Sequence, residues 1–188
     1  MAEIKTPVNL LADISRRFQV PDDWTTARDP MYEHKPECSS ESGHAKARRT
    51  AVKIMIVDDS YDNRFILRKT LETRGICIEE CDGKQAVGSF VKALHENEPF
   101  DLVCMDIMMP EVDGQTALQI IRAVENKWGV PPGQECKVIM ISALNSPGEV
   151  SKAFFKGCAT DYVTKPIDRD RLLAKIDAIM DNSCPGEF

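Results

Sequence analysis

A regular alternation begins at residue 52, where short apolar runs and amphipathic stretches start to follow one another five times. The apolar runs span about 52–57, 76–80, 100–105, 137–141 and 160–163, and the amphipathic stretches span about 60–73, 84–96, 115–126, 147–156 and 168–180. Strict alternation of strand and helix predicts a parallel sheet with helices on both faces, because each helix carries the chain back to the same end of the sheet. We therefore expect an α/β fold built on a doubly wound, five-stranded parallel sheet.

The first fifty residues differ in composition from the rest. Residues 34–50 contain no aliphatic side chain larger than alanine, which is typical of a flexible linker. Before this linker, Thr6 and Pro7 suit a helix start, and four apolar residues then recur at helical spacing: Val8, Leu11, Ile14 and Phe18. The expected organisation is an N-terminal extension over 1–50 with a short helix at about 7–19, a domain over 51–182, and a C-terminal tail over 183–188.

Composition and charge exclude several classes of function. The chain has 188 residues and a net charge of −6, and the acidic excess lies after residue 50. A phosphate backbone would be repelled by such a surface, so we expect no nucleic-acid partner. No apolar run is long enough to cross a bilayer and no signal peptide is present, so we expect no membrane association. The seven cysteines include no CxxC pair and indicate a reducing, cytoplasmic location.

Charged and hydroxyl side chains follow four of the five expected strands where each ends: Asp58-Asp59, Asp106, Ser142 and Lys165-Pro166. The carboxyl ends of parallel strands share one edge of the sheet, where such folds bind ligands. Converging carboxylates repel one another unless a cation lies among them, and hard oxygen ligands favour Mg²⁺ completed by phosphate oxygens. A lysine and a hydroxyl would bind those phosphate oxygens. This set indicates phosphoryl transfer onto a carboxylate, with Asp106 as nucleophile.

Each of these residues also has an ordinary structural interpretation. The acidic pair Asp58-Asp59 could simply cap a helix, and Asp106 could be a turn residue. A hydroxyl such as that of Ser142 often caps a strand end locally, and Lys165 could be a solvated turn residue. The joint occurrence of all of them after strands one, three, four and five favours a phosphate site.

With these residues in place, the chain over about 52–182 resembles the response-regulator receiver domain of two-component signalling. The resemblance depends on the following matched motifs: Asp58-Asp59, Met105-Asp106-Ile107-Met108-Met109-Pro110 followed by Gly114, Ser142-Ala143, and Lys165-Pro166. For the sheet we expect the flavodoxin-like strand order 2-1-3-4-5. Ser142 stands where the family more often has threonine, and it keeps the hydroxyl.

The resemblance implies a role for each matched residue. Asp106 would be the phosphoacceptor, and Asp59, Asp106 and the backbone carbonyl of Met108 would hold Mg²⁺, with Asp58 assisting through water. Ser142 would contact the phosphoryl group and Lys165 would pair with it. The aromatic switch position falls on Tyr162, whose alternative interpretation is a half-buried strand residue. The peptide bond before Pro166 would be cis.

The function implied is that of a receiver module that takes a phosphoryl group from a histidine kinase or a histidine phosphotransfer protein. Only about eight residues follow the last expected helix, so we expect no output domain, and the module would act on a downstream protein target or in a phosphorelay. It would catalyse only its own phosphorylation and dephosphorylation.

Three alternatives remain at this point. A phosphatase of the haloacid-dehalogenase type also uses an aspartate nucleophile and Mg²⁺, but the place of its second aspartate is taken here by Met108. A flavodoxin-like electron carrier would need hydroxyls and amides where this chain has Asp58-Asp59. A degenerate receiver acting only as a scaffold would not need the complete set of site residues.

Overall fold

The computed structural model describes residues 51–142 and 159–181, which fall within one compact unit, Ala51–Phe188. Its elements, in chain order, are β1 (Val52–Val57), α2 (Tyr61–Leu71), β2 (Gly75–Glu80), α3 (Gly83–His95), β3 (Leu102–Asp106), α4 (Gly114–Trp128), β4 (Lys137–Ser142), β5 (Asp161–Thr164) and α6 (Arg169–Asp181). Every one of these elements was expected from the sequence. The helices expected at 7–19 and 147–156, the linker and the tail at 183–188 lie outside the described residues. Among the helices described, none is long and apolar enough to cross a membrane.

The five strands form one parallel sheet in the order β2-β1-β3-β4-β5, which confirms the predicted strand order. In its register, Asp106 lies beside Ile141, and Ser142 lies beside Thr164. The carboxyl ends of β3, β4 and β5 are therefore level with one another. The strand order reverses between β1 and β3, so the residues that follow these two strands face a shared crevice.

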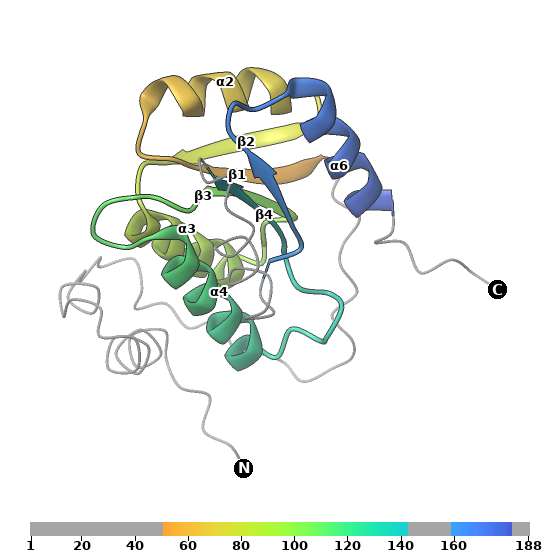
Figure 1. Ribbon diagram of the computed structural model, residues 1–188. Helices are drawn as coiled ribbons and strands as arrows, with labels where there is room; N and C mark the ends of the chain where they lie inside the picture. The colour runs from red at the N-terminus through yellow and green to blue at the C-terminus, as the bar shows by residue number, and fades with distance from the viewer. Residues whose placement is uncertain (1–50, 143–158, 182–188) are drawn as a thin grey trace, which may run out of the picture. The chain divides into compact units, whose positions relative to one another are not determined.

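Helices cover both faces of the sheet, with α2 and α6 on one face and α3 and α4 on the other (Figure 1). The face under α2 and α6 is filled by buried side chains from the strands and helices: Ile54, Ile56, Leu67, Leu71, Leu102, Cys104, Ile139, Ile141, Val163, Leu172 and Ile176. A slip of one residue in β1, β3 or β4 would exchange the two buried faces of that strand and destroy the packing of both. The core thereby fixes the height at which each strand presents its last residue to the site.

Only some of the apolar residues of helix α2 form its packed side. Phe65 and Ile66 lie in the helical register of the apolar residues, but they are 49% and 53% exposed. The buried positions are Leu67, Thr70 and Leu71. Periodicity thus identified the helix without identifying its packed side.

Two helices begin at the carboxyl edge of the sheet with an aspartate cap. The Asp82 side chain accepts a hydrogen bond from the Gln85 amide at 2.8 Å, and Asp113 accepts one from the Thr116 amide at 2.7 Å. Such caps satisfy amide groups that have no partner within the helix. They fix the first turns of α3 and α4 beside the ends of β2 and β3.

Candidate functional site

Three carboxylates meet at the carboxyl edge of the sheet. Asp58 and Asp59 follow β1, Asp106 ends β3, and one oxygen from each lies within 4.8 Å of the others. Asp58 and Asp106 are only 0% and 4% exposed, whereas Asp59 is exposed. Carboxylates this close repel one another, and burial strengthens the repulsion because water no longer screens it. The arrangement attracts cations.

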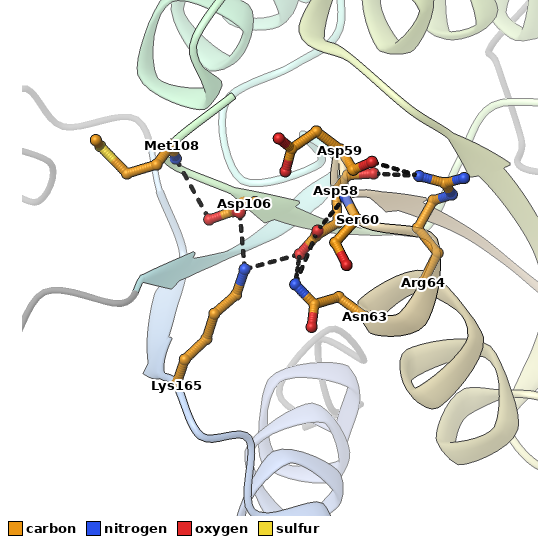
Figure 2. A network of polar contacts seen from close by, with 8 residues as sticks. All are labelled: Asp58, Asp59, Ser60, Asn63, Arg64, Asp106, Met108 and Lys165. Carbon is orange, nitrogen blue, oxygen red and sulfur yellow. Dashed lines mark hydrogen bonds and ion pairs between the residues drawn. The ribbon is translucent and has the colours of Figure 1, made fainter. Parts of the chain in front are cut away.

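One of those cations is the protein's own Lys165. Its Nζ atom donates to Asp58 Oδ2 at 2.9 Å and to Asp106 Oδ2 at 2.7 Å, so it joins the ends of β1 and β3 (Figure 2). Burial is the largest influence and lowers the pKa of Lys165, but the hydrogen bonds and charges of Asp106 and Asp58 together raise this pKa above its usual value. Lys165 is therefore charged at neutral pH.

The backbone around Lys165 sets the direction of its side chain. Its amide donates to the Ser142 carbonyl at 2.7 Å, so the turn after β5 is tied to the end of β4. The peptide bond between Lys165 and Pro166 is cis, the isomer that the resemblance implied. The amide hydrogen bond to Ser142 holds the lysine at the edge of the sheet.

The first turn of α2 holds the acidic pair by contacts that the sequence did not suggest. The Asn63 Nδ2 atom donates to both oxygens of Asp58, at 3.0 and 3.1 Å, and the Ser60 amide donates to Asp58 Oδ1 at 2.9 Å. Arg64 donates from one guanidinium nitrogen to the backbone carbonyls of Asp58 and Asp59, at 2.7 and 3.2 Å. The sequence signal that could have identified Asn63 and Arg64 is their position in the first turn of the helix that follows the acidic pair. Side chains in a helix tilt toward its N-terminus, which here lies beside Asp58 and Asp59.

The phosphoacceptor candidate Asp106 is packed against the start of α4. A Cβ atom at Gly114 would lie 2.0 Å from the Asp106 carbonyl oxygen, so only glycine fits there. The Gly114 amide donates to the Ile107 carbonyl at 3.0 Å, and the Met108 amide donates to Asp106 Oδ1 at 3.3 Å. The Met108 side chain is 61% exposed. This packing fixes the backbone of Asp106 and turns its carboxylate toward Lys165.

The two remaining predicted residues lie on neighbouring strands. Ser142 ends β4, the strand next to that of Asp106, and is 1% exposed. Tyr162 is half-buried in β5, and the Nζ atom of Lys175 lies 5.7 Å from the centre of its ring. The structure therefore brings Ser142 to the same edge as the carboxylates and Lys165, while Tyr162 sits three residues before Lys165 on the outer strand.

The donor set fits a hard divalent cation. Carboxylate oxygens are the ligands that Mg²⁺ prefers in proteins, usually one or two of them together with waters and phosphate oxygens. Three carboxylates balanced by one ammonium leave two negative charges, which is the charge that one Mg²⁺ ion neutralises. Phosphate oxygens bound beside such an ion would meet the ammonium of Lys165 as well.

A doubly wound sheet with an acidic cluster and a lysine at its switch point defines a class of signalling domain, and comparison with known proteins agrees. The family model described as the response regulator receiver domain matches residues 54–177. The chain belongs to this family.

Two relatives show the range of proteins that contain such a domain. The chain is 36% identical over 129 residues to the chemotaxis protein CheY of Bacillus subtilis, a match that covers 68% of this chain and 96% of that protein. It is also 36% identical over 125 residues to the signal transduction histidine-protein kinase BarA of Escherichia coli; that match covers 66% of this chain but only 12% of BarA. The similarity to BarA therefore concerns one of its parts.

Solved structures give the same result. The BeF3-activated DrrB receiver domain matches with a TM-score of 0.54 and 28% identity, over 69% of this chain and 97% of that one. A chain of the CheX–CheY–BeF3–Mg complex from Borrelia burgdorferi matches with a TM-score of 0.57 and 30% identity, over 69% and 89%. The protein is thus a phosphoacceptor signalling module of the CheY-like type, and the haloacid-dehalogenase alternative gains no support.

Proposed function

We propose that Asp106 is the phosphoacceptor, and that it receives its phosphoryl group from a phosphohistidine on a histidine kinase or a histidine phosphotransfer protein. The observation that carries this assignment is the contact of Lys165 with both Asp106 and Asp58, at 2.7 and 2.9 Å. An ammonium beside a buried carboxylate supplies the positive charge that an incoming phosphoryl group needs.

Each step of the transfer has a residue to perform it. An oxygen of Asp106 attacks phosphorus, the new O–P bond forms as the N–P bond to histidine breaks, and the imidazole keeps the electron pair of the broken bond. Lys165 pairs with the phosphoryl oxygens, and the Ser142 hydroxyl donates to one of them. Tyr162 then follows the movement of Ser142 toward the phosphoryl group.

Mg²⁺ is the cofactor in this proposal. Asp59, Asp106 and the Met108 backbone carbonyl would hold it directly, and Asp58 would act through water; the donor set described above supports this choice. When bound, the ion neutralises charge on the phosphoryl oxygens. The domain catalyses only its own phosphorylation and dephosphorylation, and it acts in the cytoplasm by changed binding of a downstream protein or by passing the phosphoryl group along a relay.

The test uses a small acyl-phosphate donor with Mg²⁺ and the full chain. Intact mass spectrometry should show one added phosphate on the wild type and none on Asp106→Asn. Asp62→Asn, which changes an exposed aspartate in the first turn of α2, is the matched control and should be modified like the wild type. Equal modification of Asp106→Asn and wild type would show that the assigned nucleophile is wrong.

A further inference from the structure

The carboxylate of Asp58 has all its hydrogen-bonding positions taken. Oδ1 accepts from the Ser60 amide at 2.9 Å and from Asn63 at 3.0 Å, while Oδ2 accepts from Asn63 at 3.1 Å and from Lys165 at 2.9 Å (Figure 2). An ionised carboxylate offers about four such positions. Asp58 is also fully buried, so water does not compete for them. Its side chain is held in a single orientation.

Asn63 and Arg64 hold different parts of Asp58, Asn63 its side chain and Arg64 its backbone. Arg64 donates to the backbone carbonyls of Asp58 and Asp59 and so fixes the chain, and the rotation of the Asp58 side chain is the freedom that remains. Asn63 removes that freedom, because one amide nitrogen contacts both carboxylate oxygens. Of the other two donors, the Ser60 amide contacts only Oδ1 and Lys165 is shared with Asp106.

We propose that Asn63 is a positioning residue for the Mg²⁺ site, acting through Asp58. This inference rests on the proposed function, since it concerns the metal that the phosphoacceptor site would bind. A water-mediated contact from Asp58 to Mg²⁺ would need the Oδ2 position that Lys165 holds here, so Asp58 loses that donor when the metal binds. Asn63, which contacts both oxygens, then keeps the carboxylate in its orientation. Groups that orient metal ligands from behind commonly change metal affinity about 10- to 100-fold when they are removed.

The first experiment measures Mg²⁺ binding directly, by calorimetry on the full chain without a phosphoryl donor. Asn63→Leu keeps the volume of the side chain and removes its donors, and we expect a Mg²⁺ dissociation constant about 10-fold higher than that of the wild type. Asn126→Leu makes the same change at an exposed position in the last turn of α4 and should bind Mg²⁺ like the wild type. If Asn63→Leu does not fold, Asn63→Ala replaces it.

A second readout separates positioning from a purely structural role. With a small acyl-phosphate donor, Asn63→Leu should need about 10-fold more Mg²⁺ to reach half its maximal rate, but the rate at saturating Mg²⁺ should stay within about twofold of the wild type. A lower melting temperature with an unchanged Mg²⁺ requirement would reduce Asn63 to a structural residue and overturn the inference.

The decisive control is a double-variant cycle with Asp58. Asp58→Ala should weaken Mg²⁺ binding by itself, and adding Asn63→Leu should weaken it no further, because Asn63 then has no carboxylate to orient. A second full loss in the double variant would contradict action through Asp58. The outcomes are separable: a wild type that takes no phosphate refutes the proposed function, whereas a phosphorylated wild type with equal Mg²⁺ affinity in Asn63→Leu refutes only the role of Asn63.

Discussion

Buried carboxylates occur at both ends of the sheet, and the two groups are built differently. At the amino end, Glu125 is 3% exposed, accepts from Arg122 at 2.5 Å and from the Cys136 amide at 2.6 Å, and Arg122 also donates to the Cys136 carbonyl at 2.9 Å. One negative charge meets one positive charge there. At the carboxyl end, three carboxylates share the single ammonium of Lys165.

The difference in charge balance separates a structural cluster from a functional one. The Glu125 cluster ties the last turns of α4 to the residue before β4, and it is complete without any ligand. The Asp106 cluster keeps two negative charges that the described protein contacts do not neutralise, which costs stability in exchange for cation binding. A buried acid alone is therefore a poor indicator of a site, whereas an unbalanced set of acids is a good one.

The largest expected effect concerns the balanced cluster. Glu125→Ala removes the carboxylate that accepts from one guanidinium nitrogen of Arg122 and from the Cys136 amide, and it should lower the free energy of unfolding by about 3 kcal/mol. Urea titration measures the change. Glu72→Ala, which breaks the exposed pair of Lys69 and Glu72, should cost less than about 0.5 kcal/mol. Folded Glu125→Ala should be phosphorylated like the wild type. Loss of phosphorylation in this variant would contradict the assignment of a structural role to the Glu125 cluster and a functional role to the Asp106 cluster.

A smaller effect is expected when the charge of the unbalanced cluster is changed. At a Mg²⁺ concentration ten times the dissociation constant, the wild type should gain about 1.4 kcal/mol over the metal-free protein, because only the folded state forms the site. Asp106→Asn should lose this gain and should be more stable than the wild type in chelator by about 1 kcal/mol, since repulsion with Asp58 and Asp59 is relieved. Thermal unfolding with and without chelator tests both. A metal-free Asp106→Asn that is clearly less stable would contradict the repulsion argument.

The smallest expected effect concerns Cys104, an uncharged side chain buried in β3 between the two carboxylate clusters. Burial raises the pKa of the Cys104 thiol from 9.0 to about 12. An unfolded chain therefore releases this proton at a lower pH than the folded one. The contribution of the protonated Cys104 thiol to the free energy of unfolding is therefore intact below about pH 9 and falls as the pH rises toward 12. Between about pH 9.5 and 10.5, the wild type should lose about 1 kcal/mol more stability than Cys104→Ala. Parallel losses in the two proteins would show that Cys104 does not titrate differently on unfolding.

The sequence predicted the sheet and the set of strand-end residues for one physical reason. The spacing of apolar residues and the positions of polar residues can be read from short stretches of sequence. In a parallel sheet the carboxyl ends of all strands lie at the same edge, so the residues that follow the strands can be placed together once the strands are identified. Asp58, Asp106 and Lys165 could thus be placed at one edge before any distance was known, and the structure brings these three into contact.

What the sequence did not predict depends on rotation about helix axes and on contacts between distant segments. The register of α2 allowed Phe65 and Ile66 to be buried, but the packing of Leu67 and Leu71 decided the rotation and left them exposed. The same rotation directs Asn63 at Asp58. The roles assigned to Ser142 and Tyr162, and the organisation of residues 1–50, stay predictions.

The clash that forbids a side chain at position 114 has a consequence for genetics. A Cβ atom there would meet the backbone oxygen of Asp106, and every residue type carries that oxygen. Trimming a neighbouring side chain therefore cannot make room, and a suppressor of Gly114→Ala would have to shift the path of the chain between β3 and α4. We expect a selection for such suppressors to return almost exclusively reversions to glycine.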